Sequence, residues 1–261
     1  MSTLAGKVSV VTGATSGIGR GIAEHFAALG SNVVVHGRDR ADGLETVRRV
    51  KAAGSDAEYF DGDLTSEEVC RSVIRFAVER FGGLDILVNN AGDTGRGDLE
   101  HIAVDRWDTI LAVNLRAPFI LTRGIARQMI EKGTKGSVIN ISSGAARKMR
   151  RTVVPYCTSK TALDRLTKGF AIELAEFGIR VNALEPGFAA GSSVSNLTDE
   201  HINNTIAAIP LGRPSAPSDV ANGLLYLASD ASSYVTGATL TIDGGNSIGS
   251  LAVHQAKKHP L

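Results

Sequence analysis

Cysteine is scarce in this chain of 261 residues, where Cys70 and Cys157 are the two thiols and do not stand in C-x-x-C spacing. Two such thiols make no disulfide framework, so the reducing cytoplasm is the expected location. The sequence also lacks an apolar run near the roughly 18 residues of a membrane span, and residues 1–7 lack the basic and apolar regions of a signal peptide. We therefore expect neither export nor a membrane partner.

An excess of one charge sign is missing as well, because 28 Lys and Arg balance 27 Asp and Glu to a net charge of +1. This balance gives no reason to expect nucleic acid as a partner. The six histidines show no H-E-x-x-H or comparable spacing, so no metal site is predicted. At this length, with 43% hydrophobic residues, the chain should form one domain over residues 1–261 with a sizeable core.

The chain does contain a regular alternation of short apolar runs and longer helical patterns. This alternation predicts an α/β fold: a Rossmann-type doubly wound parallel sheet of about seven strands, with helices on both faces in an α/β/α arrangement. Residues 188–217 break the rhythm, because they are rich in Gly, Ser, Asn and Pro with one short helix near 199–208, which is typical of a substrate lid. The expected strands are 7–12, 32–36, 56–60, 84–88, 136–142, 179–184 and 238–242, and the expected helices are 18–29, 40–53, 66–80, 105–131, 153–177 and 218–229.

A glycine-rich turn follows the first strand, with Gly13, Gly17 and Gly19 in G-A-T-S-G-I-G. In open α/β sheets, ligands bind beyond the carboxyl ends of the strands, and missing side chains let backbone N–H groups and a helix N-terminus face a pyrophosphate. A tight strand-to-helix turn is the simpler alternative. Two further strand ends favour a dinucleotide, because Asp63 can accept from an adenine amine and Asn89 to Gly92 offer an amide near a ribose.

The residues after the second strand, His36-Gly37-Arg38, indicate which dinucleotide binds. An acidic residue here would bind a ribose 2′-hydroxyl and repel a 2′-phosphate, whereas a guanidinium attracts the phosphate. The predicted cofactor is therefore NADP(H), with NAD(H) as the alternative. In the competing interpretation, Arg38 is a solvated residue at the head of a helix, paired with Asp39 or Asp42.

Tyr156 and Lys160 stand four residues apart, so a helix places both side chains on one face, and Ser143 closes the strand before them. A free tyrosine titrates near 10, and a nearby lysine ammonium should lower the pKa of the phenol and suit it to proton exchange. Asn114 precedes Pro118 by four residues. Because proline has no N–H, the main-chain carbonyl of Asn114 should lose its helical partner and be free to hold a water.

Together these motifs resemble the short-chain dehydrogenase/reductase family over nearly the whole chain. The resemblance is carried by T-G-A-T-S-G-I-G at 12–19, N-N-A-G at 89–92, Asn114, Ser143, Y-C-T-S-K at 156–160, P-G at 186–187 and D-G-G at 243–245. It implies a nicotinamide cofactor, a homotetramer, and a catalytic set of Asn114, Ser143, Tyr156 and Lys160. Ser142 is the rival of Ser143, but the thirteen-residue step from Ser143 to Tyr156 is the family's common one. The implied cofactor-binding residues are Gly13, Thr15, Ser16, Gly17, Ile18, Gly19, Arg38, Asp63, Leu64, Asn90, Ala91, Gly92, Tyr156, Lys160, Pro186, Gly187 and Ala189.

Two positions depart from the family pattern. Four residues after the Gly of P-G, the family usually has a Thr that hydrogen-bonds the nicotinamide carboxamide, and this chain has Gly191, followed by Ser192 and Ser193. One of those serines substitutes for the Thr, or the loop closes differently. Glu185 replaces a residue that is usually small and uncharged, either as a solvated strand end or as a substrate contact.

The predicted reaction is hydride transfer between NADP(H) and a ketone or secondary alcohol, with Ser143 holding the substrate oxygen, Tyr156 exchanging the proton and Lys160 binding the ribose. One alternative is a 3-oxoacyl thioester reductase, although Glu176 and Phe177 offer no basic docking site. An alternative of another class is a non-catalytic dinucleotide-sensing module. Four cations lie between the serine and the tyrosine, and they either face water or another subunit, or recognise an anionic substrate: Arg147, Lys148, Arg150 and Arg151.

Overall fold

A parallel sheet of seven strands organises the protein, as the alternation predicted. The computed structural model describes residues 4–95, 97–98, 100–189 and 198–249. The strand order is β3-β2-β1-β4-β5-β6-β7, with every pairing parallel. The order reverses between β1 and β4, which makes this the switch point where open α/β sheets bind ligands. The strands are β1 (Val8–Val11), β2 (Asn32–Gly37), β3 (Ala57–Asp61), β4 (Ile86–Asn89), β5 (Ser137–Ile141), β6 (Arg180–Pro186) and β7 (Thr239–Ile242).

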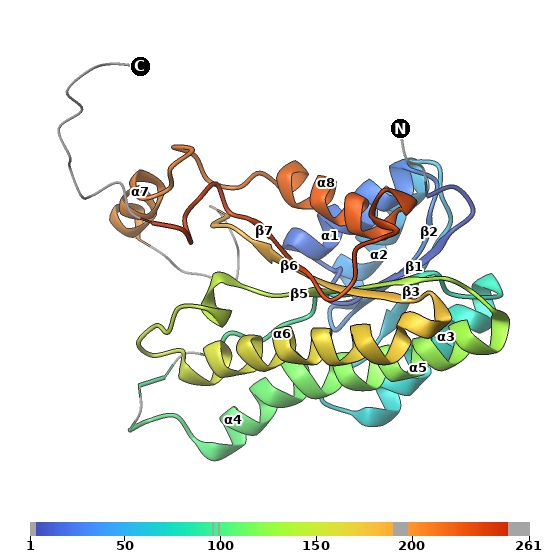
Figure 1. Cartoon of the computed structure of the whole chain (residues 1–261), viewed down its shortest axis with the longest axis horizontal. Coiled ribbons are helices and arrows are strands. Elements are labelled where there is room, and N and C mark those ends of the chain that lie inside the picture. The colour runs from blue at the N-terminus through green and yellow to red at the C-terminus, as the bar shows by residue number, and fades with distance from the viewer. Residues whose placement is uncertain (1–3, 96, 99, 190–197, 250–261) are drawn as a thin grey trace.

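Helices cover both faces of this sheet (Figure 1). One face carries α1 (Gly17–Ala28), α2 (Arg40–Ala52) and α8 (Pro217–Ala228), and the other carries α3 (Glu67–Phe81), α5 (Ala117–Lys132) and α6 (Val154–Leu174). Each face buries its own apolar core, one including Phe26 and Leu224, the other Val73 and Leu121. Two shorter helices are α4 (Val104–Leu111) and α7 (Asp199–Ala207), and α7 lies where a short helix was expected. In the described part of the chain, every helix is too short or too polar to cross a membrane.

Local signals explain where these elements begin and end. Helix α3 begins after Ser66, whose hydroxyl accepts from the N–H of Val69, and ends at Gly82, where φ is +77° and an L side chain would be strained. Strand β2 reads N-V-V-V-H-G, and its three valines are fully buried. Buried β-branched runs of this kind are typical of a parallel strand between two helical layers.

The sequence predicted one helix over 105–131, whereas the structure has two helices, α4 and α5, separated by a π-helical turn at Ala112–Arg116. Pro118 lies in the first turn of α5 and has no N–H, so the α-helical hydrogen bond to the carbonyl of Asn114 cannot form there. The N–H of Ala117 instead donates to the carbonyl of Ala112. Such wide turns occur frequently at functional sites, and this one carries Asn114.

Candidate active site

The glycine turn is packed against the loop after β4 so closely that side chains are excluded. A Cβ at Gly19 would lie 2.2 Å from the carbonyl oxygen of Gly13, and a Cβ at Gly13 would lie 2.9 Å from the Cα of Ala91. Asn90 Nδ2 donates to the carbonyl oxygens of Thr12 at 2.9 Å and Gly13 at 3.1 Å. The hydroxyl of Thr12 accepts from the N–H groups of Asn90 and Ala91, each at 3.0 Å. The sequence reasoning missed this role of Thr12, which ties the two strand ends into one unit.

The start of α1 presents backbone N–H groups that no side chain caps. Ser16 is the N-cap residue in an extended conformation, its hydroxyl makes no capping hydrogen bond, and the first turn contains no acidic residue. Gly17 has a φ of +54° and open space beside it. Because a helix N-terminus attracts anions, the turn from Gly13 to Gly19 fits a pyrophosphate, including the predicted residues Thr15 and Ile18.

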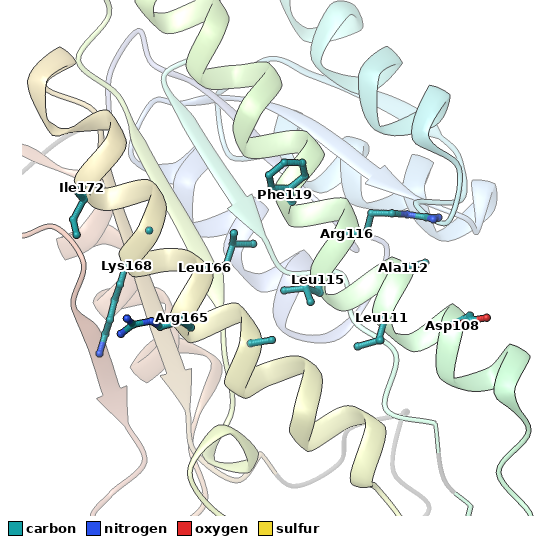
Figure 2. A pocket seen from close by; sticks show the side chains of 12 residues that line it. Asp108, Leu111, Ala112, Leu115, Arg116, Phe119, Arg165, Leu166, Lys168 and Ile172 are labelled. Atoms are coloured by element: carbon teal, nitrogen blue, oxygen red, sulfur yellow. The ribbon is translucent and has the colours of Figure 1, made fainter.

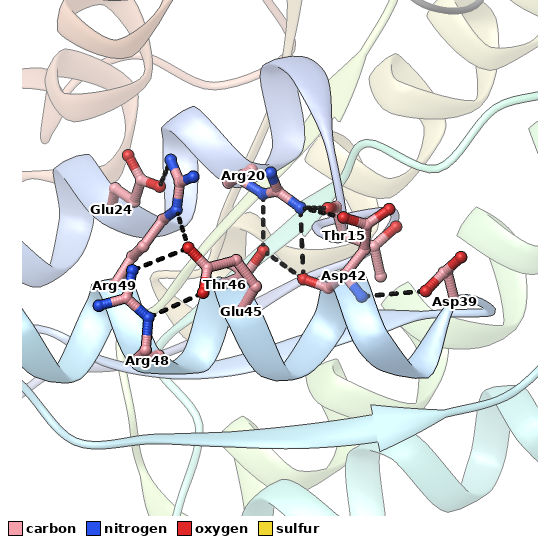
Figure 3. Close-up of polar contacts among 9 residues, drawn as sticks. All are labelled: Thr15, Arg20, Glu24, Asp39, Asp42, Glu45, Thr46, Arg48 and Arg49. Carbon is pink, nitrogen blue, oxygen red and sulfur yellow. Dashed lines mark hydrogen bonds and ion pairs between the residues drawn. The ribbon is translucent and has the colours of Figure 1, made fainter.

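Thr15 is held between the first two βα units by Arg20 (Figure 3). The guanidinium of Arg20 contacts the carbonyl of Thr15, pairs with Asp42 at 2.8 Å, and donates from Nε to the hydroxyl of Thr46 at 2.9 Å. A Cβ at Gly37 would lie 2.2 Å from Cγ2 of Thr15. Any side chain at position 37 would therefore require the Thr15 side chain to shift, and glycine permits this close approach.

Arg38 lies exposed at the end of β2 and reaches Asp63 at the end of β3. The distance from Arg38 Nη1 to Asp63 Oδ2 is 3.6 Å, and the side chains are 74% and 47% exposed. Arg38 is solvated at the head of α2, as the competing interpretation expected, but its ion pair is with Asp63 and not with Asp39 or Asp42. Asp39 caps α2 by accepting from the N–H of Asp42, and Asp42 pairs with Arg20. Exposed ion pairs contribute little, so Arg38 can bind another anion at small cost.

Ser143, Tyr156 and Lys160 come together at the same edge of the sheet. The hydroxyl of Ser143 lies near the phenol of Tyr156 and acts to lower its pKa, and Tyr156 lies in the first turn of α6. Lys160 Nζ lies 5.8 Å from the centroid of the Tyr156 ring and donates to the carbonyl of Ile141 at 2.6 Å. A proton donor, a second hydroxyl and a buried amine thus share one small region.

The sequence predicted that Lys160 lowers the pKa of Tyr156, and this prediction is wrong for the protein without a bound cofactor. Burial raises the pKa of the phenol above its ordinary 10, against smaller opposing effects of the Ser143 hydrogen bond and the positive charge of Arg150. Burial also lowers the pKa of Lys160 to about 8, against a smaller opposing effect of Asp164. The reason is that removal from water penalises the charged form of each group, which moves an acid upward and a base downward.

Asn114 is fully buried, and its side chain is engaged on both sides. Its Nδ2 donates to the carbonyl of Asp93 at 2.8 Å and to the hydroxyl of Ser159 at 3.0 Å, and its Oδ1 accepts from the N–H of Asp93 at 2.7 Å. A Cβ at Gly92 would lie 3.6 Å from Asn114 Oδ1 and 3.8 Å from Lys160 Nζ. The loop after β4 therefore lies between the glycine turn and Lys160. The predicted binding of a water to the main-chain carbonyl of Asn114 stays a prediction.

Glu185 is buried near the end of β6, where its side chain is 1% exposed and pairs with Arg147 at 2.7 Å. A solvated strand end is therefore wrong, because the carboxylate is buried and paired with a cation of the chain itself. A substrate contact stays a prediction. The four cations between Ser143 and Tyr156 therefore differ in their surroundings. Lys148 donates to the main chain of the turn after β7 at 3.2 Å, while Arg150 and Arg151 are exposed.

The remaining predicted residues lie around the same strand ends. The N–H of Gly187 donates to the carbonyl of Ile242 at 2.7 Å, and a Cβ there would lie 2.7 Å from the Cα of Asp243, so the P-G and D-G-G motifs are in contact. Pro186 ends β6, Ala189 lies in the irregular chain after it, and Leu64 is buried in the core. Predicted residues outside the described ranges are Gly191, Ser192 and Ser193.

A large apolar groove lies away from this site, on the outer side of α4, α5 and α6 (Figure 2). It has a volume of about 1140 Å³, and its lining includes Asp108, Phe119, Arg165 and Leu166. Ile172, which also lines the groove, is 80% exposed and Phe119 is 41% exposed. The groove includes none of the predicted catalytic or cofactor residues.

Comparisons with known proteins agree with this geometry. A family model described as Enoyl-(Acyl carrier protein) reductase matches residues 13–247. The chain is 36% identical over 246 residues to the 2,5-dichloro-2,5-cyclohexadiene-1,4-diol dehydrogenase LinX of Sphingobium indicum, covering 94% of this chain and 98% of the relative.

Two solved structures share the fold. One is a 7 alpha-hydroxysteroid dehydrogenase complexed with NADH and 7-oxo glycochenodeoxycholic acid, with a TM-score of 0.89, 33% identity, and coverage of 93% of this chain and 95% of that one. The other is a gluconate 5-dehydrogenase from Burkholderia cenocepacia J2315 in complex with NADP and tartrate, with a TM-score of 0.86, 32% identity, and coverage of 95% and 97%. The seven-stranded sheet, the match over residues 13–247 and these relatives establish that the chain belongs to the short-chain dehydrogenase/reductase family, whose members here are oxidoreductases that use a nicotinamide dinucleotide.

Proposed function

We propose that the protein transfers hydride between NADP(H) and a ketone or secondary alcohol. The observation that carries the proposal is the buried amine of Lys160 5.8 Å from the Tyr156 ring, with the hydroxyl of Ser143 near enough to the phenol to affect its pKa. The cofactor, held by the glycine turn and the loop after β4, would supply or accept the hydride. In this assignment Ser143 holds the substrate oxygen and Tyr156 donates the proton on reduction or accepts it on oxidation.

Lys160 and Asn114 support the phenol in this proposal. A lysine ammonium near the ring favours the phenolate that forms when the proton leaves, and Lys160 would also bind the ribose. Asn114 fixes the loop that carries Gly92 through three hydrogen bonds to Asp93 and Ser159. Its main-chain carbonyl is the proposed holder of a relay water.

We assign the cofactor preference to Arg38. Gly37 supplies no competing carboxylate, and a side chain there would meet Thr15. Within the described residues, the exposed guanidinium of Arg38 forms a single weak pair, with Asp63. We expect Arg38→Ala to reduce kcat/KM for NADPH by about 10- to 100-fold, the usual range for a charge-assisted hydrogen bond, and to leave kcat/KM for NADH nearly unchanged.

Arg48→Ala is the matched control for this test, because Arg48 pairs with Glu45 on the same helix and lies outside the proposed phosphate site. Initial rates at the nicotinamide absorbance band would be compared for both cofactors. Equal losses with NADPH and NADH, or a wild-type preference for NADH, would overturn the assignment of Arg38.

The substrate proposal is a small ketone or alcohol that carries a carboxylate. Arg150 supports it, because this exposed cation acts electrostatically on the phenol of Tyr156, while Arg147 is engaged by Glu185. The solved gluconate 5-dehydrogenase, in complex with NADP and tartrate, handles substrates of this class. Residues 188–217, which contain α7, are the proposed lid.

A panel of carboxylated and neutral ketones and alcohols with NADPH and NADH tests the proposed function. Turnover favouring the carboxylated members supports it, and turnover of a 3-oxoacyl thioester alone would support the reductase alternative, which shares the acyl-carrier chemistry in the description of the matching family model. Tight binding of NADPH without turnover of any member would favour the dinucleotide-sensing module. Cytoplasmic location and the lack of nucleic acid or membrane partners stay predictions.

We also propose that the groove between α5 and α6 is covered by a second copy of the chain, as part of the implied homotetramer. The groove carries an acidic Asp108 and a basic Arg165, so a two-fold related copy can place opposite charges across the contact. Light scattering should show an oligomer for the wild type and smaller particles for Ile172→Glu, because a carboxylate would be buried in the contact. Leu44→Glu, at an exposed residue outside the groove, should leave the mass unchanged; a monomeric wild type would contradict the proposal.

A further inference from the structure

The ion pair between the buried Glu185 and the half-exposed Arg147 joins three segments of the chain. Glu185 Oε1 lies 2.7 Å from Arg147 Nη2, and the hydroxyl of Thr241 donates to Glu185 Oε2 at 3.5 Å. The same Nη2 donates to the hydroxyls of Thr241 at 3.1 Å and Ser247 at 3.0 Å. Glu185 is 1% exposed and Arg147 is 47% exposed, so the carboxylate is the partner that depends on the contact, because an unpaired charge is costly in a buried position.

The loop that carries Ser143 rests on this carboxylate. Gly144 follows Ser143, and a Cβ there would lie 3.3 Å from Glu185 Oε1. Ser143 caps the 3₁₀ turn at Gly144–Ala146 by accepting from a main-chain N–H at 3.2 Å, and Arg147 closes that turn. The hydroxyl of Ser143 and the guanidinium of Arg147 therefore belong to one short, hydrogen-bonded piece of chain.

Arg147 also contacts the turn after β7, at Ser247. The residues that follow α7, Pro210 and Leu211, pack on this turn, and we call them the base of the α7 segment. Asp243 holds this turn by accepting from the N–H groups of Gly245 at 2.9 Å and Ser247 at 2.7 Å. Leu211, which follows α7, donates its N–H to the turn at 3.1 Å. A Cβ at Gly245 would also lie 2.9 Å from Pro210, so the chain after α7 is packed directly on this turn.

We propose that Arg147 and Glu185 form a positioning clamp that sets the distance between Ser143 and the base of the α7 segment, and with it how substrate lies against Ser143 and Tyr156. The proposal rests on the proposed function for its kinetic consequences. Arg147 acts by holding the turn after β7, and Glu185 acts by holding Arg147. Arg147 Nη2 contacts all three acceptors. A guanidinium suits this role because its planar group has a fixed orientation, whereas an ammonium on a flexible stem is less well oriented.

The kinetic test is a double-mutant cycle of Arg147→Gln, Glu185→Gln and the double variant. Arg147→Gln should lose on the order of 100-fold in kcat/KM for the best ketone, through both kcat and KM, because small displacements of positioned groups have effects of that size. Glu185→Gln should lose only about tenfold, since Arg147 keeps its contacts with Thr241 and Ser247. The double variant should resemble Arg147→Gln instead of the product of the two losses, because Glu185 acts through Arg147. Affinity for NADPH should fall less than kcat/KM in all three, because the clamp borders the Pro186–Gly187 end of β6 but does not touch the glycine turn or Arg38.

Arg127→Gln is the matched control, because Arg127 and Glu131 form an Arg–Glu pair that is exposed on both sides. Arg147→Lys should recover part of the activity of Arg147→Gln. If Arg147→Gln fails to fold, Arg147→Lys and Glu185→Gln carry the same test. Losses that multiply in the double variant, or an Arg147→Gln enzyme with the kinetics of Arg127→Gln, would overturn the proposal.

Hydrogen exchange of the substrate-free protein provides a test that does not depend on turnover. The amides of Gly245, Ser247 and Leu211 should exchange at least about tenfold faster in Arg147→Gln than in Arg127→Gln, because local opening becomes easier when an anchoring contact is lost. Unchanged exchange at these amides overturns the clamp even if the enzyme is active. A wild-type protein without turnover whose exchange responds as expected would instead refute the proposed reaction and leave the clamp supported.

Discussion

Tyr156→Phe should lose on the order of 10³-fold in kcat, within the range that a general acid or base contributes, while its affinity for NADPH and its stability change little. The substitution removes the phenolic oxygen near Ser143 and keeps the ring next to Lys160. Because the carbonyl oxygen of the substrate would then receive its proton from no positioned donor, the chemical step slows while binding does not. Single-turnover rates with NADPH and the best ketone of the panel measure this directly.

The pH dependence of the wild type sharpens this prediction. Burial raises the pKa of the Tyr156 phenol, so the proton required for reduction is present throughout the neutral range. Reduction should therefore fall only in alkaline solution, as pH rises through the raised pKa, whereas alcohol oxidation, which needs the phenolate, should increase over the same range. Tyr156→Phe should show neither limb.

Tyr234→Phe is the matched control, because Tyr234 is fully exposed and its substitution also removes one phenolic oxygen. It should keep the kcat and the pH profile of the wild type. A Tyr156→Phe enzyme that retains more than about a tenth of kcat would show that another group donates the proton, since general acid catalysis contributes at least about 10²-fold where it operates.

Lys160→Met should make the substrate-free protein more stable at pH 7 while reducing kcat/KM by on the order of 10²-fold, the lower end of what acid–base groups contribute. Lys160 is 4% exposed, and its amine donates to one main-chain carbonyl, that of Ile141. Burial lowers its pKa from 10.5 to about 8, which at 1.36 kcal/mol per pH unit makes the charged form about 3 kcal/mol less favourable in the folded protein. Methionine avoids this cost and gives up a hydrogen bond of about 1 kcal/mol.

The sign of this effect reverses with pH. The folded pKa of Lys160 lies below the unfolded value, so below about pH 8 both states hold the proton and the full penalty applies. Between about pH 8 and 10.5 the unfolded chain binds more protons than the folded chain, so the stability of the wild type rises. The advantage of Lys160→Met, about 2 kcal/mol at pH 7, should therefore shrink and then reverse over this range.

Urea unfolding of both proteins at pH 7 and at pH 10, at one protein concentration because assembly contributes to stability, measures this difference. Lys51→Met is the control, since Lys51 is half exposed and pairs with Asp56 on the surface. Its effect should stay within about 0.5 kcal/mol. A Lys160→Met protein that is less stable than the wild type at pH 7 would contradict the account of Lys160 as a destabilising buried amine.

The sequence was sufficient for the parts of this protein that short-range patterns encode. Alternating apolar runs and helical periods predicted the parallel sheet and its helices, since each element reports its own buried face. The glycines at positions 13, 17 and 19 predicted a turn between the first strand and the first helix. The structure contains this turn, where a Cβ at Gly13 or Gly19 would meet Ala91 or Asn90. The spacing of Tyr156 and Lys160 placed both on α6, because residues four apart share one side of a helix.

The tertiary structure decided what depends on neighbours far apart in the chain. Asn114 meets Ser159 across 45 residues, and Glu185 meets Arg147 across 38 residues, so no local pattern could show that Arg147 is engaged. Burial, not the nearness of Lys160, governs the pKa of Tyr156, because the energy of a charge depends on how much water the whole fold removes from it. Local sequence thus determined which chemical groups stand at the strand ends, and only the packed fold determined their partners and their charge.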